Sequence, residues 1–327
     1  MISDSKWKEL NERLKFASRI TITAHINPDG DAIGSELAFY YYLKHLGKDV
    51  NILNISSTPD VYMFLDKENV INTYSDDNFL KSSDLLIALD VSKFGRMGKI
   101  ARDAKKNNIS VITIDHHPKH TQNFFIQEII DTSASSAGYL VYQFIKKFNP
   151  EFIDKKIALF LYCALVTDTG YFHYDNSSFE AHKMAGELVQ IGISPPEVYE
   201  KLYEQNSLER IKLLGYILQN LQVEYDGKVV WFTITQNMLK KYKVKLEETE
   251  CFSDIVRTIK NLKVCIIIKE MKDGKISVNL RSKDNVKING IAHRLGGGGH
   301  PYASGIKFDK PLEKVIPLIV NAIGEIL

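Results

Sequence analysis

Short apolar runs separated by helical segments constrain the fold of the first half of this chain more than any other feature. Residues 84–89 and 111–114 are almost continuously apolar, as strands are when both faces of a sheet are covered. Residues 20–24 form a similar run, and segments 33–46 and 96–107 have a helical pattern. This alternation of strands and helices predicts a mainly parallel α/β sheet with helices on both faces.

The second half of the chain has a different pattern. Residues 195–221 read as a helical connector. Strand-like segments follow at 229–234 and 264–268, and an Asp273-Gly274 turn leads into 275–280, which indicates a hairpin. The predicted parts are a larger α/β domain at 1–190, a helical linker at 191–222 and a smaller α/β domain at 223–327.

Length and composition indicate a globular protein. The 327 residues suffice for two domains, each with its own core. No apolar run approaches the roughly 18–20 residues that span a bilayer, and the charged N-terminus does not resemble a signal peptide. Cys163, Cys251 and Cys265 are widely spaced and predict reduced thiols. We therefore expect a cytoplasmic protein with no membrane partner.

The charge balance limits the partners further. The chain has 42 basic and 40 acidic residues, which gives a net charge of +2. Proteins that grip long nucleic acids neutralise many phosphates and carry a strong basic bias. We therefore expect no long nucleic acid partner, and a nucleic acid substrate would have to be short. A homodimer is compatible with the sequence, which leaves the oligomeric state open.

Side chains that can bind metals follow each of the three apolar runs. In chain order they are His25, Asp29 and Asp31, then Asp90, then Asp115, His116 and His117. The carboxyl ends of parallel strands meet at one crevice, where ligands bind. So many carboxylates and imidazoles would repel one another, or shift their pKa values strongly, unless cations lay between them. The pattern therefore predicts a metal centre.

The ligand types indicate which metals fit. Asp and His without Cys suit Mn²⁺ or Mg²⁺ better than a structural zinc. Two such ions about 3.5–4 Å apart are a recurring device for hydrolysing phosphate esters. Each piece alone has a simpler explanation, since Asp29 and Asp31 suit a turn and Asp90 suits a helix N-cap. Their joint occurrence at one end of the sheet favours the metal centre.

A run of four glycines, at residues 296–299, is the strongest feature of the second half. Glycine lets backbone N–H groups approach an anion closely, because no Cβ is in the way. An Arg and a His nearby would add charge, so the loop predicts a pocket for a terminal phosphate or a nucleotide. The simpler alternative is a flexible loop between domains. The expected substrate-binding residues here are Arg281, Ser282, Gly297, Gly298, Gly299 and His300.

Together these motifs resemble those of the DHH phosphoesterases that carry a DHHA1 domain. The segment His25-x-Asn-Pro-Asp29-Gly-Asp31 is similar to the first family motif, and Asp115-His116-His117 to the motif that names the family. The remaining similarities are Leu89-Asp90 with Arg96-Met-Gly98, Val166-Thr-Asp168-Thr-Gly170, and Gly296-Gly-Gly-Gly-His300-x-x-Ala303-x-Gly305. The resemblance spans about residues 20 to 308 and is greatest to bacterial oligoribonucleases (nanoRNases) that are also 3′-phosphoadenosine 5′-phosphate phosphatases.

The resemblance implies a role for each site residue. One metal would be held by His25, Asp29 and Asp90, and the other by Asp31, Asp90, His116 and Asp168, so that Asp90 bridges both ions. His117 would lie beside the scissile phosphate as a hydrogen-bond donor or proton shuttle, and Asp115 would orient an imidazole. Arg96 would contact phosphate, although an exposed arginine at a helix start is the simpler explanation. The second domain would grip the 5′ end of the substrate.

The function that the resemblance implies is hydrolysis of short 5′-phosphorylated oligoribonucleotides to mononucleotides. Dephosphorylation of 3′-phosphoadenosine 5′-phosphate is a second candidate activity. The alternatives are a phosphodiesterase for cyclic di-AMP or linear dinucleotides and, from another class, a non-hydrolytic RNA-binding protein. His173 stands where related sequences often have Arg, and Ala137-Gly138 where Thr and Glu are common. These differences leave the expected metal ligands intact but put the substrate preference in doubt. Cleavage polarity and the identity of the metal also stay open.

Overall fold

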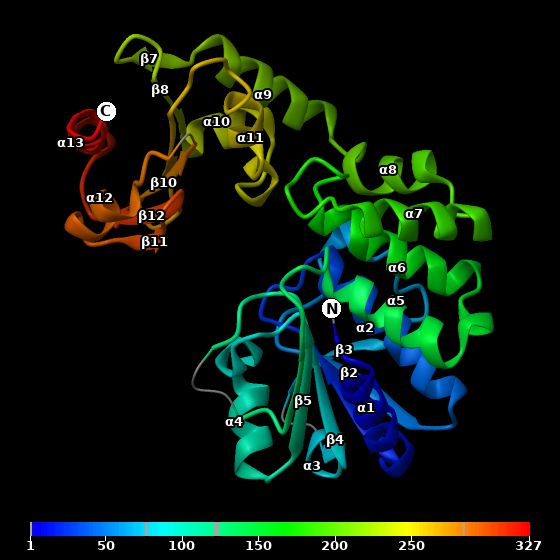
Figure 1. The fold of residues 1–327 in the computed structure, drawn as a ribbon. Helices are drawn as coiled ribbons and strands as arrows, with labels where there is room; N and C mark the ends of the chain where they lie inside the picture. Colours follow the sequence, from blue (N-terminus) through cyan, green and yellow to red (C-terminus); the bar gives the residue numbers. More distant parts are fainter. Residues whose placement is uncertain (1, 76–77, 121–123, 284) are drawn as a thin grey trace. The chain divides into compact units, whose positions relative to one another are not determined.

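The computed structural model describes residues 2–75, 78–120, 124–283 and 285–327. The chain forms two compact units, Met1–Gln205 and Asn206–Leu327, each with its own sheet (Figure 1). The predicted linker is divided between them, since α8 (Pro195–Tyr203) belongs to the first unit and α9 (Leu208–Gln219) to the second. Among the described residues, no helix combines the length and the apolar character needed to cross a membrane.

The first unit contains a six-stranded sheet in which all neighbouring strands run parallel, in the order β3-β2-β1-β4-β5-β6. The strands are β1 (Arg19–Thr23), β2 (Asp49–Asn54), β3 (Ile71–Thr73), β4 (Leu85–Leu89), β5 (Ser110–Asp115) and β6 (Gln127–Ile130). Every residue of β4 is buried, as expected of a strand covered on both faces. The predicted parallel α/β fold is confirmed.

Helices cover both faces of this sheet, as the alternating side chains of β4 show. Leu85, Ile87 and Leu89 belong to the main core, whereas Leu86 and Ala88 belong to a smaller core on the other face. The main core includes residues of α1 (Asp4–Phe16), α2 (Gly30–His45), α5 (Ala137–Phe148), α6 (Lys155–Asp168) and α7 (Phe179–Ile191). The smaller core includes residues of α3 (Asn78–Lys81) and α4 (Lys99–Lys106). Short 3₁₀ turns lie at Asp60–Tyr62 (η1), Phe94–Met97 (η2) and Pro150–Phe152 (η3).

Helices α2 and α6 pack unusually closely, because small residues line their contact. A Cβ added to Gly34 would lie 2.4 Å from the carbonyl oxygen of Phe160, and one added to Gly30 would lie 2.5 Å from the Thr167 side chain. The start of α2 therefore lies against the end of α6. This contact brings two distant parts of the sequence, around residues 30 and 168, to the same place.

The second unit is built on a mixed sheet in the order β11-β12-β10-β9-β8-β7, in which only β8 and β9 pair in parallel. Its strands are β7 (Gln222–Glu224), β8 (Val229–Ile234), β9 (Val264–Glu270), β10 (Ile276–Ser282), β11 (Gly298–His300) and β12 (Ala303–Phe308). Its other helices are α10 (Gln236–Tyr242), η4 (Glu247–Thr249), α11 (Phe252–Val256), α12 (Asn289–Arg294) and α13 (Leu312–Gly324). The predicted hairpin is confirmed, since β9 and β10 pair antiparallel around Gly274, which has φ +79°.

Replacing Gly34 by Ala is expected to destabilise the first unit by roughly 1–3 kcal/mol, the usual cost of overpacking. The added methyl group would collide with the backbone of α6. Denaturant unfolding followed by circular dichroism measures the change. Gly186→Ala in α7 is the matched control, because Gly186 has open space around its Cβ position. That control should gain about 0.5–1 kcal/mol from helix propensity, and equal losses in both variants would contradict the prediction.

Candidate metal centre

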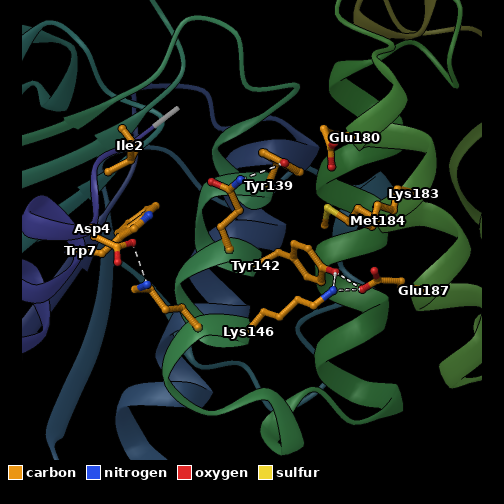
Figure 2. Close-up of a pocket in the computed structure, with 12 residues that line it drawn as sticks. Ile2, Asp4, Trp7, Tyr139, Tyr142, Lys146, Glu180, Lys183, Met184 and Glu187 are labelled. Atoms are coloured by element: carbon orange, nitrogen blue, oxygen red, sulfur yellow. Dashed lines mark hydrogen bonds and ion pairs between the residues drawn. The ribbon is translucent and has the colours of Figure 1, made fainter.

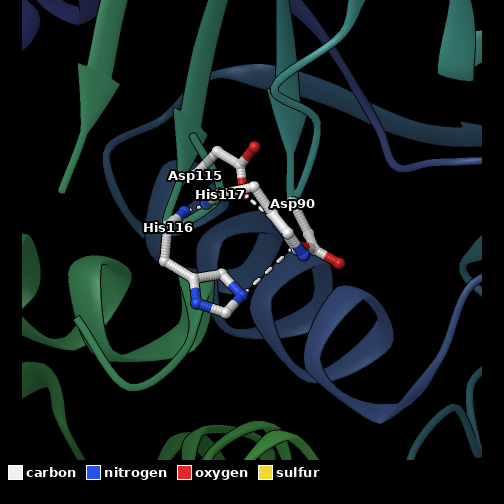
Figure 3. A group of neighbouring side chains, drawn as sticks. All are labelled: Asp90, Asp115, His116 and His117. Atoms are coloured by element: carbon white, nitrogen blue, oxygen red, sulfur yellow. Dashed lines mark hydrogen bonds and ion pairs between the residues drawn. The ribbon is translucent and has the colours of Figure 1, made fainter. Parts of the chain in front are cut away.

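The residues expected to bind metals meet at the carboxyl end of the first sheet. Three groups of them have ligand atoms within 4.8 Å of one another. The groups are His25, Asp29 and Asp90, then Asp31, His116 and Asp168, and then Asp90, Asp115, His116 and His117. Figure 3 shows the last group, in which Asp90 follows β4, Asp115 ends β5, and the two histidines come directly after it. The structure thus brings together all seven residues picked from the strand ends, and adds Asp168 from the end of α6.

Asp90 lies at the middle of the cluster. One of its carboxylate oxygens is 3.1 Å from His25 Nε2, and the other is 3.7 Å from His116 Nε2. Its backbone has φ +58°, a costly conformation for a residue other than glycine. The Asp90 N–H donates to the carbonyl of Ile114 in β5, at 3.0 Å, and so ties this bend to the sheet. The carboxylate therefore faces both imidazoles.

His25 is fixed so that its Nε2 is free to bind a metal. Its Nδ1 lies 2.9 Å from the carbonyl oxygen of Ile26. A carbonyl only accepts hydrogen bonds, so Nδ1 carries the proton and Nε2 keeps its lone pair. Behind His25, Asn54 accepts from the N–H of Ala24 and donates to the buried carboxyl group of Glu36. Burial raises the pKa of Glu36 to about 8.

Asp29 divides its two oxygens between two tasks. Oδ1 accepts from the N–H groups of Asp31 and Ala32, both at 3.1 Å, and so caps the N-terminus of α2. Oδ2 lies 3.8 Å from His25 Nε2. The simpler explanation of this motif, a local turn or cap, is therefore correct for one oxygen only. The other oxygen faces the candidate metal site.

Asp31 is held by the start of another helix. Its carboxylate accepts from the N–H groups of Ala137 and Gly138, at 2.6 and 2.8 Å, and from Ser35 Oγ at 3.2 Å. Ala137 and Gly138, two of the three positions where this chain departs from the resembled motifs, therefore contribute backbone groups. A side chain at position 138 would collide with Ala164, because a Cβ there would lie 2.4 Å from the Ala164 Cβ. Burial raises the pKa of Asp31 well above its usual value.

Asp168 completes the second group and is oriented by a residue that the sequence did not reveal. Asn176 Nδ2 donates to Asp168 Oδ2 at 3.0 Å and to the Asp168 carbonyl at 3.1 Å. The same Asp168 oxygen lies 3.5 Å from His116 Nε2. Asn176 lies in a loop with no regular pattern, so only the fold shows its role. Burial, reinforced by the charge of Asp90, raises the pKa of Asp168 to about 6.

Divalent cations fit this donor set. Within the described residues, His25 Nε2 and His116 Nε2 are buried without a hydrogen-bond partner. Buried polar atoms rarely lack partners, and here each faces carboxylate oxygens. Two cations would satisfy these atoms and neutralise the crowded carboxylates. His25, Asp29 and Asp90 would hold one, and Asp31, Asp90, His116 and Asp168 would hold the other.

Asp115 orients both histidines that follow it. Its Oδ1 accepts from the N–H groups of His116 and His117, at 2.7 and 3.1 Å, and lies 2.9 Å from His117 Nδ1. The His117 side chain stays 41% exposed. Hydrogen bonds to Asp115 and Asp90 raise the pKa of His117 to about 10. His117 is thus a positively charged donor at the open side of the cluster.

The backbone of Arg96 lies beside that of the candidate ligand His25, because the Arg96 carbonyl accepts from the N–H of Ile26 at 2.9 Å. It is part of η2, between β4 and α4. Arg96 as a whole residue is half-buried. A phosphate contact by Arg96 remains a prediction.

In the second unit, much of the glycine run is a strand rather than the expected loop. Gly298–His300 form β11, which pairs with β12. The N–H of Gly297 donates to the carbonyl of Ala292 at 2.7 Å, so it is not free to bind an anion. A Cβ at Gly297 would lie 2.2 Å from the Gly305 carbonyl oxygen. Close strand packing therefore explains this glycine, whereas His300 is exposed.

Arg281 and Ser282 lie on opposite faces of β10. Arg281 lines a cavity of about 300 Å³, together with Lys269 and Asn279. Ser282 is buried, and its Oγ donates to the carbonyl of Val286 at 2.6 Å. The structure therefore does not place the Ser282 hydroxyl in the pocket that Arg281 lines.

A further cavity, of about 330 Å³, lies between α1, α5 and α7 (Figure 2). Two of its three lysines have partners, since Lys147 pairs with Asp4 at 2.9 Å and Lys146 contacts Glu187. It shares no residue with the metal-binding groups. This cavity is therefore not part of the candidate active site.

The fold and the cluster of carboxylates and imidazoles define a metal-dependent phosphoesterase. The chain belongs to the DHH family: residues 19–165 match the DHH family, N-terminal domain, and residues 229–327 match the DHHA1 domain. The resemblance seen in the motifs is thus confirmed.

The relatives agree with this assignment. The chain is 30% identical over 299 residues, 91% of each protein, to the bifunctional oligoribonuclease and PAP phosphatase NrnA of Bacillus subtilis (strain 168). An exopolyphosphatase-related protein from Bacteroides fragilis has a similar structure, with a TM-score of 0.91, 28% identity, and 99% of this chain and 97% of that chain covered. The exonuclease RecJ bound to manganese shares the fold, with a TM-score of 0.54, 14% identity, and coverage of 99% and 94%.

The affinity for Mn²⁺ is expected to fall as the pH falls through about 6. The expected ligand is ionised Asp168, whose raised pKa means that below about pH 6 a proton must leave before the cation binds. Each further unit of pH should cost up to about tenfold in affinity per proton displaced. Isothermal titration calorimetry between pH 5 and 7.5 measures this slope. Asp168→Asn should bind more weakly with a shallower slope, and a wild-type affinity independent of pH would contradict the prediction.

Asn176→Ala is expected to weaken Mn²⁺ binding by about 10- to 100-fold, the usual effect of removing a residue that orients a metal ligand. Asp168 would keep its place in the chain but lose the donor that fixes its carboxylate. Calorimetric titration with Mn²⁺ measures the loss. Asn72→Ala, an exposed asparagine in β3, is the control and should change the affinity less than twofold; equal affinities in both variants would rule out the role of Asn176.

Proposed function

We propose that this protein hydrolyses the phosphodiester bonds of short oligoribonucleotides to give mononucleotides, using two divalent cations. The arrangement of Asp90 supports this most directly, since its two oxygens face imidazoles that belong to two different ligand groups. One buried carboxylate shared by two groups suits a bridging ligand. Mn²⁺ is the proposed ion, because Asp and His ligands suit it.

The proposed chemistry divides between the cations and the protein. When bound, the two cations lower the pKa of a water molecule and neutralise charge on the phosphoryl oxygens. His117, held by Asp115 and positively charged, donates a hydrogen bond to a phosphate oxygen or to the leaving oxygen. Asp90 links the two ligand groups, because it belongs to both. Arg96 supplies further positive charge near the phosphate.

The proposed substrate is short for two reasons. The net charge of +2 does not provide a basic track for a long polyanion. The similar Bacillus protein is named an oligoribonuclease and PAP phosphatase, so dephosphorylation of 3′-phosphoadenosine 5′-phosphate is the second proposed activity. Arg281 and His300 are the proposed contacts to the 5′ end of the substrate.

The three free thiols support a cytoplasmic location.

Purified protein with Mn²⁺ is expected to cleave a 5′-labelled diribonucleotide to mononucleotides. Asp90→Asn should lower kcat by about 10²–10³-fold or more, because the amide cannot replace the charge of the carboxylate between the two sites. Chromatography of the products measures the rate. Asp60→Asn, at an exposed position in η1, is the control and should keep full activity. A wild-type protein no faster than Asp90→Asn would refute the proposal.

A substrate panel separates the alternatives. It compares the dinucleotide with 3′-phosphoadenosine 5′-phosphate, a 24-mer and cyclic di-AMP. A higher kcat/KM for cyclic di-AMP would replace the proposal with a cyclic dinucleotide phosphodiesterase. Tight RNA binding that needs no metal and gives no product would instead indicate the non-hydrolytic RNA-binding protein.

A further inference from the structure

The segment after the ligand Asp168 is a turn with an unusual backbone. Gly170, Tyr171 and Phe172 have φ values of +56°, +55° and +66°. Glycine adopts such values readily, but a bulky aromatic residue does so at a cost. Two aromatic residues in succession keep this conformation only where their surroundings fix it. The surroundings of the turn therefore fix its conformation beside the metal centre.

Two of its side chains anchor the turn. The Tyr171 hydroxyl donates to the carbonyl of Pro195 at 2.8 Å, and its ring packs edge-on against Tyr199 of α8, with centroids 5.0 Å apart. The ring of Phe172 stacks on His182 of α7 at 4.7 Å. The turn is thus fastened to the two helices that follow it.

The backbone of the turn is fastened at the metal centre as well. The N–H groups of His173 and Tyr174 donate to the carbonyl of Thr169, at 2.9 and 3.0 Å. Asn176, two residues further on, donates to the carboxylate of Asp168. Tyr174 therefore lies in a segment held by two contacts, one to the carbonyl of Thr169 and one to the carboxylate of Asp168.

These contacts hold Tyr174 in place without burying it. Its ring lies directly over Gly170, where an added Cβ would be 2.5 Å from the ring. His173 packs edge-on against it at 5.9 Å. The side chain nevertheless stays 58% exposed. A large ring that is fixed, mostly exposed and packed over Gly170, two residues after the candidate ligand Asp168, contributes little to a core, so its position suits contact with a substrate.

We propose that Tyr174 is a specificity-determining residue that stacks on a nucleobase of the substrate. The inference rests on the proposed function and adds to it the part of the substrate that is recognised near the metals. A base is joined to its phosphate through a single sugar, so a stacking ring has to lie beside the metal centre. Aromatic stacking accepts any base. Tyr174 would thus distinguish nucleotides with unpaired bases from base-free phosphate esters, and not one base from another.

The experiment compares a diribonucleotide with the same compound lacking its bases. Tyr174→Ala is expected to lower kcat/KM for the dinucleotide by about 5- to 100-fold, the usual range for loss of one base stack. Its kcat/KM for the base-free compound should change less than twofold. Tyr174→Phe keeps the ring and should restore wild-type values on the dinucleotide. Phe16→Ala removes a ring that is 85% exposed at the end of α1 and serves as the control.

Each outcome decides between the inference and its alternatives. Equal losses on both compounds would mean that Tyr174 only positions Asp168, and would overturn the inference. Unchanged rates for Tyr174→Ala on the dinucleotide would overturn it too. Quenching of a 2-aminopurine base by wild type and Tyr174→Phe, and not by Tyr174→Ala, would support stacking directly. Failure of the wild type to cleave any dinucleotide would instead refute the proposed function itself.

Discussion

Repulsion among buried carboxylates is the constraint on which the rest of the first unit depends. Asp31 and Asp90 are almost fully buried, and Asp168 lies beside them, so their charges oppose one another in a region shielded from water. The protein opposes this repulsion with fixed donors, namely the start of α5 at Asp31 and Asn176 at Asp168. The close packing of α2 on α6 brings Asp31 and Asp168 into the same group of carboxylates and imidazoles.

Much of the fold could be predicted from the sequence, because the inner strands are buried on both faces and leave a continuous apolar signal. The outer strands leave a weaker one. All three residues of β3 are at least partly exposed, and β6 alternates between buried and half-buried positions. Neither strand was predicted. The glycine run was expected to be a loop, but part of it forms β11. This strand could not be predicted, because it exists only through pairing with β12 and glycine has little intrinsic preference for strands.

The candidate site could be predicted where the ligands follow buried strands, since topology alone brings such residues together. Asp168 depended on the family resemblance, because it ends a helix rather than a strand. Asn54 and the N–H groups of Ala137 and Gly138 could not be predicted, since their roles arise from contacts between segments far apart in the chain. Asn176 is only eight residues from Asp168, but it lies in a turn without a regular pattern that could reveal its contact. Ser282 was wrongly expected to bind substrate together with Arg281. Neighbouring residues along a strand point to opposite faces, so the two side chains do not share a pocket.

The different roles of the two Asp29 oxygens have a consequence for how the protein responds to the loss of metal. One oxygen caps α2 and the other faces the metal site, so the helix start does not need a cation to be complete. In small zinc domains, by contrast, the metal and the fold arrive together. Here the protein's own atoms complete the cap, and the second oxygen faces the metal site without any change at the start of α2. Loss of metal would then leave this helix start intact.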